Sequence, residues 1–263
     1  MSSKIEANGI TINYQFDGPE DGPVVMFSNS LISNLTMWND QIEAITSAGF
    51  RMLRYDQRGH GATDAPENPY SIEIFADDAV LLLDALGIDK VHFVGLSMGG
   101  FIAQQIGAKY PDRVLSLSLC DTACIMPTEK LWNDRIAEAK VGGTAALADA
   151  TLGRWFTASY HESNPEKVRL VREMINASNV TGYIRCARAI RDMRQCDILD
   201  QVKAPTIIIV GEEDPACPVA SAKVLHEGVK GSELVIIKDA AHLPNIQKRD
   251  EFNTTLLGFL STL

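Results

Sequence analysis

Short apolar runs alternate with amphipathic stretches along much of the chain. Runs of four to seven residues without a regular polar alternation are typical of strands that helices cover on both faces. Their alternation with helical patterns predicts a parallel sheet built from right-handed βαβ units. The first four runs are Val24 to Phe27, Arg51 to Tyr55, Val91 to Val94 and Val114 to Cys120.

A hairpin precedes these runs, because Asn8-Gly9 supplies the turn between Lys4 to Ala7 and Thr11 to Phe16. We therefore expect an antiparallel pair at the start of the sheet. The stretches between the later runs have helical periodicity, and the predicted helices cover Met37 to Ala48, Ile72 to Leu86 and Met98 to Tyr110.

The strand signal stops after Cys120 and returns only at Thr206. Residues 128–194 instead show several short helical patterns broken by glycine and proline. We expect a mostly parallel eight-stranded sheet flanked by helices, formed by residues 1–123 and 201–263, with a helical cap of residues 124–200 inserted after the sixth strand. The last elements predicted are the strands Thr206 to Val210 and Leu234 to Ile237 and the helices Pro218 to Val229 and Asp250 to Leu263.

The composition is that of an ordinary globular domain: 263 residues, 46% hydrophobic and 22% charged. A net charge of −10 repels phosphate backbones and anionic membrane surfaces, so we expect neither nucleic acid nor a membrane as partner. There is no apolar run long enough to span a bilayer and no signal-peptide pattern. We expect a cytoplasmic protein, and the sequence leaves monomer and homodimer open.

Five cysteines are present, an odd number without CxxC spacing. This pattern favours reduced thiols in a cytosolic protein over a disulfide framework. We expect each to be a small buried or half-buried apolar residue: Cys120, Cys124, Cys186, Cys196 and Cys217.

Gly95-Leu96-Ser97-Met98-Gly99 matches the G-x-S-x-G nucleophile elbow. The match directly follows an apolar strand and precedes a helix, and this context makes it more specific than its five letters. A tight strand-to-helix turn strains the backbone at the serine, and only very small residues fit two positions to either side. We predict Ser97 as a nucleophile and the Met98 backbone N–H as an oxyanion donor.

A serine hydroxyl needs a base, usually a histidine held by a carboxylate. His242 follows the last predicted strand and precedes the last helix, where a parallel sheet presents residues at its carboxyl edge. We predict His242 as the base. The other histidines are placed in a glycine-rich turn, a strand, the cap and a helix, respectively: His60, His92, His161 and His226.

The acid should follow a strand that lies between the serine and the histidine in the chain. Asp214 does so, and we predict it as the triad acid. Glu212 and Glu213 are close competitors that also fit solvated loop charges, and Asp121, at the end of another strand, is a more distant one.

The second oxyanion donor is expected in the loop after the Val24 to Phe27 strand. We predict the Leu31 N–H, with Asn29 and Ser30 in place of a His-Gly pair; the alternative is a polar loop without a catalytic part. The turn Arg58 to Gly61 is expected to support the site structurally, without chemistry of its own.

Further blocks of residues are distributed along nearly the whole chain: Ser28-Asn29-Ser30-Leu31 with Met37-Trp38, Arg54 to Gly61, Gly95 to Gly100, Arg154-Trp155-Phe156-Thr157, Ala189-Ile190-Arg191-Asp192 and Ala241 to Ile246. Together these blocks resemble the α/β-hydrolases, and among them the 3-oxoadipate enol-lactonases. Departures from that pattern are Ile32 and Ser33 in place of Gly-Thr, Pro244 in place of Ser and Gln247 in place of Glu.

The resemblance implies an enol-lactone substrate that carries a carboxylate. Arginines of the predicted cap could bind it, and we select Arg135 and Arg188; the alternative for each is an exposed basic face, as for Arg185 and Arg191 at the same helical spacing. Tryptophans could line an acyl pocket or pack in the core, and those expected at the pocket are Trp38, Trp132 and Trp155.

Other functions use the same three residues. A general carboxylesterase or another lactonase is the main alternative, because substrate choice depends on the cap and pocket. A cofactor-free perhydrolase and a non-catalytic ligand receptor are further alternatives. Epoxide hydrolases and dehalogenases of this fold need an aspartate nucleophile, which Ser97 does not supply. Metal-ligand spacing, phosphate loops and dinucleotide glycine patterns are missing, so we expect neither metal nor cofactor. The expected ligand is a small ester or lactone substrate.

Overall fold

The computed structural model describes residues 2–126 and 128–263. The described strands form one eight-stranded sheet in the order β1-β2-β4-β3-β5-β6-β7-β8. β2 lies antiparallel to both of its neighbours, and all other pairs are parallel, which confirms the predicted architecture. The strands are β1 (Ser3–Ala7), β2 (Ile10–Asp17), β3 (Val24–Ser28), β4 (Arg51–Tyr55), β5 (Val91–Leu96), β6 (Val114–Cys120), β7 (Thr206–Gly211) and β8 (Glu233–Ile237).

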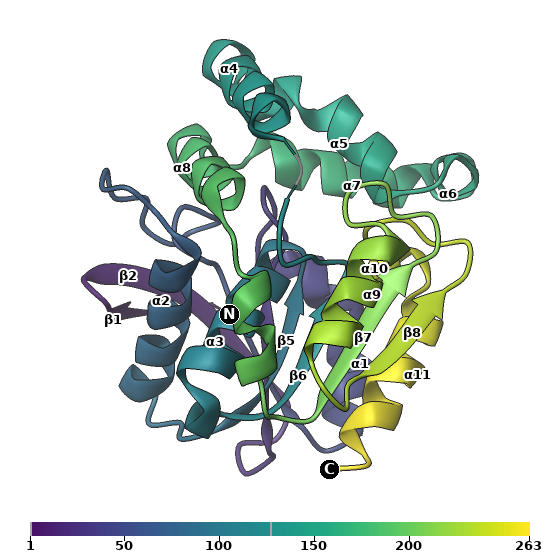
Figure 1. Ribbon diagram of the computed structural model, residues 1–263. Coiled ribbons are helices and arrows are strands. Elements are labelled where there is room, and N and C mark those ends of the chain that lie inside the picture. The colour runs from purple at the N-terminus through teal and green to yellow at the C-terminus, as the bar shows by residue number, and fades with distance from the viewer. Residues whose placement is uncertain (1, 127) are drawn as a thin grey trace.

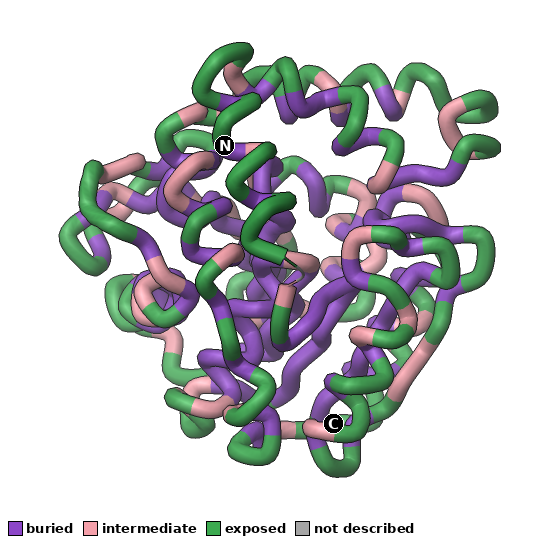
Figure 2. Tube along the Cα trace, turned by 45° about the horizontal axis from the view of Figure 1, so that its top comes forward, coloured by how far each residue is buried: buried purple, intermediate pink, exposed green. Residues whose placement is uncertain are grey.

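Helices cover both faces of the sheet (Figure 1). α1 (Ile42–Ser47) and α11 (Arg249–Leu260) pack together on one face. α2 (Ile72–Ala85), α3 (Met98–Lys109) and α9 (Val219–Gly228) cover the other (Figure 1). Every residue of β5 and β7 is buried as a result, and Figure 2 shows buried strands running through the centre with exposed positions on the outer helices. The apolar runs of the sequence are therefore strands that neither face exposes to water.

One predicted helix is divided in the structure. Met37 to Ala48 was expected to be continuous, but the chain forms a 3-10 helix, η1 (Leu35–Gln41), before α1. The Asn34 side chain caps η1 by accepting the Thr36 N–H at 2.9 Å, which favours the tighter turn. α10 (Pro244–Gln247) was not predicted, because four residues are too few to show a helical period.

The cap helices lie above one end of the sheet (Figure 1). They fall inside the range 124–200 expected for the cap, whereas η3 (Cys196–Gln201) contacts α3 and α9 of the core. Among the described residues no helix is both long and apolar enough to cross a bilayer. The cap helices are α4 (Glu129–Ala146, kinked at Gly143), α5 (Ala148–Trp155), α6 (Ala158–Ser163), α7 (Pro165–Asn176) and α8 (Val180–Asp192).

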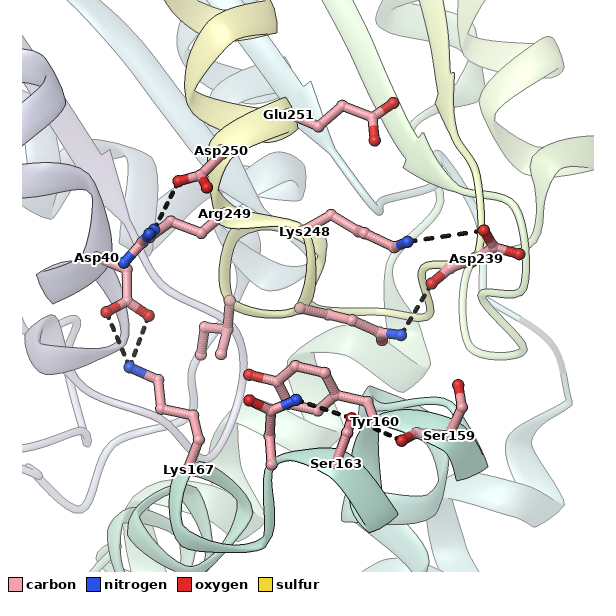
Figure 3. A pocket seen from close by; sticks show the side chains of 13 residues that line it. Asp40, Ser159, Tyr160, Ser163, Lys167, Asp239, Lys248, Arg249, Asp250 and Glu251 are labelled. Atoms are coloured by element: carbon pink, nitrogen blue, oxygen red, sulfur yellow. Dashed lines mark hydrogen bonds and ion pairs between the residues drawn. The ribbon is translucent and has the colours of Figure 1, made fainter.

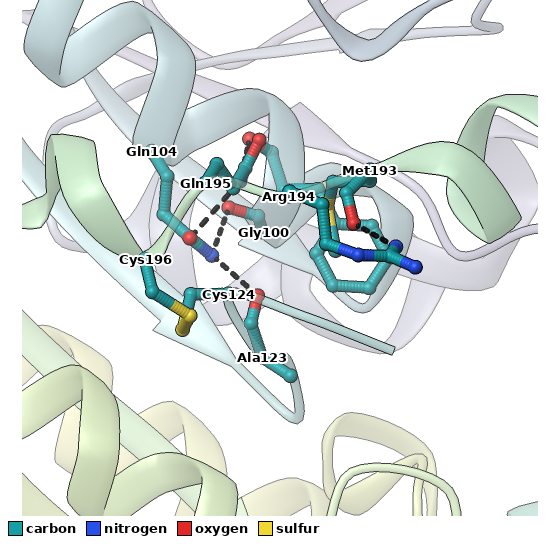
Figure 4. Close-up of a disulfide and its surroundings, with 9 residues drawn as sticks. Gly100, Gln104, Ala123, Cys124, Met193, Arg194, Gln195 and Cys196 are labelled. Carbon is teal, nitrogen blue, oxygen red and sulfur yellow. Dashed lines mark hydrogen bonds between the residues drawn. A yellow bond between two sulfur atoms is a disulfide. The ribbon is translucent and has the colours of Figure 1, made fainter. Parts of the chain in front are cut away.

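The expectation that all five cysteines are reduced is wrong, because Cys124 and Cys196 form a disulfide (Figure 4). The segments that enter and leave the cap run side by side here: Ile125 pairs with Arg194, and the Gln195 N–H donates to the Cys124 carbonyl at 3.0 Å. This proximity arises from the fold and leaves no spacing signal in the sequence. Because disulfides are rare in cytosolic proteins, the cysteines no longer favour the predicted cytoplasmic location.

Replacing both cysteines by serine, Cys124→Ser with Cys196→Ser, should lower the free energy of unfolding. The bond joins residues 72 positions apart, and loop-closure entropy for a loop of that length gives a loss of about 4 kcal/mol at most. Urea unfolding of the oxidised protein and of the double variant measures it. Equal midpoints and slopes for the two proteins would contradict the prediction.

Candidate active site

Ser97 lies on the sharp turn between β5 and α3, with φ +55° and ψ −111°. Hydrogen bonds to the Ser97 backbone hold this unusual conformation. The Ser97 N–H donates to the Cys120 carbonyl at 2.9 Å, and the Ser97 carbonyl accepts from the Gly100 N–H at 2.9 Å and the Thr122 hydroxyl at 2.8 Å. Strain of this kind in a non-glycine residue, at the carboxyl end of a central strand, is characteristic of a nucleophile elbow.

The two glycines of the elbow are required by space. A Cβ on Gly95 would lie 2.1 Å from the Gly99 carbonyl oxygen, and one on Gly99 would lie 2.1 Å from the Ser28 carbonyl oxygen. These distances are far below van der Waals contact and involve backbone that cannot move aside. The turn therefore forms only with glycine at both positions, as the sequence pattern predicts.

His242 and Asp214 lie side by side on the loops that follow β8 and β7. The His242 Nδ1 is 2.7 Å from the Asp214 Oδ2, and both side chains are buried. The other carboxylate oxygen of Asp214 accepts the backbone N–H groups of Ala216 at 2.7 Å and Cys217 at 3.1 Å. Glu212 and Glu213 are exposed, so the structure brings only Asp214 of these three acids to the histidine.

The loops that carry the acid and the histidine meet at Gly211, the last residue of β7. A Cβ there would lie 2.2 Å from the Ala241 carbonyl oxygen. The Glu213 N–H also donates to the Ala240 carbonyl at 2.9 Å. Glycine at the end of β7 thus lets the two loops approach closely enough for the His242–Asp214 hydrogen bond.

A second buried acid supports Asp214. Asp121 accepts the Gly211 N–H at 2.8 Å through Oδ1, and burial together with the nearby charge of Asp214 raises its pKa well above the usual range. Burial thus favours the protonated form of Asp121 more strongly than it would for an exposed aspartate. The competitor acid of the sequence thus lies beside the triad without replacing Asp214.

Asp214, Cys217 and His242 could in principle approach a metal ion, since one ligand atom of each lies within 4.8 Å of the others. The mutual hydrogen bond of Asp214 and His242 already uses two of these atoms. This geometry also fits a hydrogen-bonded acid–base pair of Asp214 and His242, and the absence of a metal or cofactor remains a prediction.

Ser97 and His242 line one cavity together with Leu31, the residue predicted to supply an oxyanion donor. In the described part of the chain, the Leu31 and Met98 N–H groups donate to no protein acceptor. The Ser97 hydroxyl makes no direct hydrogen bond to His242 among those residues, a contact that commonly tightens only when substrate is bound. The arrangement can hold an anionic oxygen beside a nucleophile and a base.

The cap closes this cavity with aromatic and cationic side chains. Trp132 and Trp155 line it, as predicted for the pocket, and so does Arg135, whose guanidinium lies 5.0 Å from the centre of the Trp132 ring. Arg154 and Tyr183 also line it. These two were not selected from the sequence. Arg154 could have been, because it precedes Trp155 in one of the blocks that resemble the enol-lactonases.

Burial lowers the pKa of both pocket arginines. Desolvation is the largest cause for each, and for Arg154, whose pKa falls to about 10, the positive charge of Arg135 adds to it. Neither arginine forms an ion pair with a carboxylate among the described residues. The charge of Glu138 opposes this lowering at both arginines, but Glu138 forms no ion pair with either among the described residues, so an anionic ligand between the two half-buried cations would stabilise them.

Two expected pocket residues lie elsewhere. Trp38 is fully buried, with its ring 4.9 Å from that of Phe27 and 6.3 Å from that of Phe252, so it packs in the core below the site. Arg188 is exposed on α8 and does not line the cavity, because the helical spacing places it on the solvent face. For these two residues the alternatives of core packing and an exposed basic face are correct.

A second cavity, of about 730 Å³ and larger than the one at Ser97, lies between α6 and α7 of the cap and α10 and α11 (Figure 3). It contains none of Ser97, Asp214 and His242. Its charges compensate one another in pairs, among them Lys167 with Asp40 at 2.6 Å and Lys248 with Asp239 at 3.6 Å. The larger space is therefore a polar cleft between cap and core, and the smaller cavity is the candidate active site.

His60 contacts residues 29–33, the loop that carries the predicted Leu31 donor and is called the oxyanion loop below, and His60 is fully buried. Burial lowers its pKa to about 4, so the folded protein holds it neutral where an exposed histidine is charged. The unfolded chain then binds the proton first as pH falls. The contribution of His60 to stability is complete above about pH 6.5 and is lost as pH falls toward 4, with a total of about 3 kcal/mol.

His60→Gln should remove this part of the pH dependence. Urea unfolding at pH 7 and at pH 4.5 is expected to show a larger loss of stability in wild type than in His60→Gln. The comparison of the two proteins cancels the opposite contribution of Asp56, whose pKa burial raises. Equal losses in the two proteins would show that His60 is not held neutral.

The chain is similar to known proteins over almost its whole length. Residues 23–249 match the family model for the alpha/beta hydrolase fold. The chain is 32% identical to 3-oxoadipate enol-lactonase 1 of Acinetobacter baylyi, across 97% of this chain and 95% of that protein. A crystal structure of the enol-lactonase from Burkholderia xenovorans LB400 superposes with a TM-score of 0.96 at 36% identity, covering 98% of this chain and all of the other.

A thermophilic esterase from Thermogutta terrifontis is also similar, with a TM-score of 0.92 at 26% identity over all of this chain and 98% of the other. The match of the family model, the identity to an enol-lactonase and the mostly parallel sheet with its elbow serine agree. The chain belongs to the α/β-hydrolase fold family.

Proposed function

We propose that the protein is a serine hydrolase that cleaves a carboxylic ester or lactone through an acyl-enzyme, with 3-oxoadipate enol-lactone as its substrate. The observation that carries the proposal is the meeting of the Ser97 elbow and the buried His242–Asp214 pair at one cavity. These are the nucleophile, base and orienting acid of a serine triad.

The first half of the reaction opens the lactone. The Ser97 Oγ attacks the carbonyl carbon while His242 Nε2 takes the hydroxyl proton, and Asp214 stabilises the resulting imidazolium. The Leu31 and Met98 N–H groups bind the oxyanion. Collapse breaks the ring C–O bond, His242 returns the proton to the leaving enol oxygen, and the enol becomes a ketone while it is still attached to the acyl-enzyme.

The second half releases the acid. A water molecule attacks the acyl carbon and gives its proton to His242, and the second tetrahedral intermediate is bound by the same N–H groups. Collapse returns the proton to the Ser97 oxygen. The product is the open-chain carboxylic acid, and water and the chain's own residues balance the steps.

Arg135 and Arg154 support a substrate that carries a negative charge. Both line the cavity, both are half-buried without a carboxylate partner in the described residues, and both lie on cap helices opposite the triad. A carboxylate bound between them would replace their lost solvation by charge-assisted hydrogen bonds. The similarity to two enol-lactonases points to the same class of substrate.

A general carboxylesterase acting on small neutral esters is the second candidate. It is favoured by the tryptophans that line the cavity and by the similarity to an esterase. The space inside the cavity is only about 60 Å³, well below the roughly 300–1,000 Å³ of ligand pockets, so either substrate needs the lining side chains or the cap to move.

Replacing both pocket arginines, Arg135→Ala with Arg154→Ala, separates the two candidates. On 3-oxoadipate enol-lactone, kcat/KM should fall by about a hundredfold, since hydrogen bonds to a charged group contribute about 1.5–3 kcal/mol. On p-nitrophenyl acetate it should change little. Steady-state kinetics on both substrates provide the measurement.

Arg188→Ala is the matched control, because it removes an exposed arginine of the same cap and should leave both rates unchanged. A wild type that prefers the neutral ester, together with equal effects of the double variant on both substrates, would establish the carboxylesterase instead.

A further inference from the structure

Ile32 has a backbone conformation that β-branched residues rarely adopt. Its φ is +63°, and its buried side chain lines the cavity beside Leu31. A left-handed conformation costs a residue of this type on the order of 1–3 kcal/mol and persists only where the surroundings enforce it. The oxyanion loop therefore contains a strained residue directly after its predicted donor.

His60 provides the enforcing contact. Its Nε2 accepts the Ile32 N–H at 3.0 Å, while its Nδ1 is 3.3 Å from the Arg58 carbonyl oxygen. The two contacts require a single neutral tautomer, protonated on Nδ1, because a protonated Nε2 could not accept the N–H. The imidazole is thus oriented at both nitrogens.

The loop residue on the other side of Leu31 is also held. The Ser30 N–H contacts the Met37 Sδ at 3.4 Å, and the Ser30 carbonyl accepts the Ser33 hydroxyl at 2.7 Å. Both neighbours of Leu31 thus use their N–H groups on the protein. The Leu31 N–H between them is left for the substrate oxygen.

The cap covers His60 from outside. α8 approaches the turn so closely that a Cβ on Gly182 would lie 2.0 Å from the Gly59 carbonyl oxygen. The Cys186 Sγ lies 3.9 Å from the His60 Nδ1 and 3.6 Å from the Arg58 carbonyl oxygen. Cap and core together therefore fix the imidazole, which in turn fixes Ile32.

We propose that His60 is a positioning residue of the oxyanion hole: by accepting the Ile32 N–H, it keeps Ile32 at positive φ and so holds the Leu31 N–H where the oxyanion forms. The inference rests on the proposed function, since it needs an acyl-transfer reaction at Ser97. It gives the Arg58 to Gly61 turn an indirect part in the chemistry, without contact between His60 and substrate.

His60→Phe and His60→Gln test the role. Phenylalanine keeps a planar aromatic ring, slightly larger than imidazole, but cannot accept the Ile32 N–H, whereas the Gln Oε1 can. With p-nitrophenyl acetate, His60→Phe should lower kcat by about tenfold to a hundredfold with KM changed by less than about threefold, and His60→Gln should recover the larger part. The affinity for a trifluoromethyl ketone, which forms an oxyanion on Ser97, should fall in parallel with kcat/KM.

His92→Phe is the matched control, since His92 is also a buried histidine with one side-chain partner, Ser116, on the strands below the site. It is expected to lower stability without lowering kcat. In an Ile32→Gly background the positive φ costs little, because glycine adopts it freely. His60→Phe should therefore lower kcat at least threefold less there than in wild type.

Three results would overturn the role of His60: an unchanged kcat in His60→Phe, a loss shared equally by His92→Phe, or the same loss with and without Ile32→Gly. Reaction of wild type with a fluorophosphonate separates this failure from that of the proposed function. A wild type that labels Ser97 while His60→Phe behaves as wild type refutes only the positioning role. A wild type that does not label refutes the proposed function and the inference with it.

Discussion

Replacing Ser97 by alanine should lower kcat by on the order of a millionfold, as expected when nucleophile, base and acid act as one unit. The elbow geometry is set by the backbone and by Gly95 and Gly99, so the loss of one hydroxyl should leave the fold and the cavity intact. Stopped and steady-state assays on an activated ester measure the loss, and urea unfolding checks the stability.

Ser118→Ala serves as the control. Ser118 is a buried serine on β6 whose hydroxyl has no partner in the described residues, so its removal should leave kcat close to wild type. A loss below about a hundredfold in Ser97→Ala would mean that another group attacks the carbonyl, and the assignment of the nucleophile would be abandoned.

Asp214→Asn should lower kcat by about ten-thousandfold. The amide has nearly the shape of the carboxylate, but its NH2 group facing Nδ1 favours the wrong histidine tautomer, and it no longer stabilises the imidazolium. The pocket is otherwise unchanged, so KM should move far less than kcat. Steady-state kinetics between pH 6 and pH 9 provide the measurement.

Asp121→Asn is the informative comparison, because it replaces a second buried acid within the same cluster. Burial and the charge of Asp214 raise the pKa of Asp121 well above its usual range, so a neutral asparagine is a conservative replacement, and its side-chain oxygen can still accept the Gly211 N–H. Its loss of kcat should stay below about tenfold. Similar losses in the two variants would show that Asp121 shares the role of the triad acid.

The order of strands and helices and the elbow could be predicted because local rules govern them. Strands such as β5 and β7 are buried on both faces and therefore have continuous apolar runs. Close backbone contacts leave no room for a side chain at Gly95 and Gly99. The turn therefore has a recognisable sequence pattern. His242 and Asp214 could be selected because each follows a strand that ends at the same edge of the sheet.

Features that depend on long-range packing were missed. The Cys124–Cys196 bond joins two segments that become neighbours only when the cap folds back on the core. Trp38 was assigned to the pocket although it packs between β3 and α11, and nothing local in the sequence separates these environments. Arg154 enters the pocket and Arg188 faces solvent because of the way each cap helix is rotated, which composition does not reveal.

The contact that the Arg58 to Gly61 turn makes with the loop around Leu31 could not be predicted from the sequence. As sequence, Arg58 to Gly61 is a structural turn, and the structure shows Arg58 paired with Asp78 at 2.6 Å. The contact from His60 to Ile32 crosses 28 positions and joins a residue that departs from the family pattern. The strained conformation next to this contact is visible only in the structure, as the positive φ of Ile32.

The central claim is that Ser97 is the nucleophile of a serine hydrolase, and covalent labelling tests it most directly. Wild type is treated with a fluorophosphonate, and the intact mass and the peptide masses are then recorded. The account predicts a single adduct on the peptide that contains Ser97, absent in Ser97→Ala and retained in Ser118→Ala. No adduct under conditions that label a known serine hydrolase, or an adduct on another residue, would contradict it.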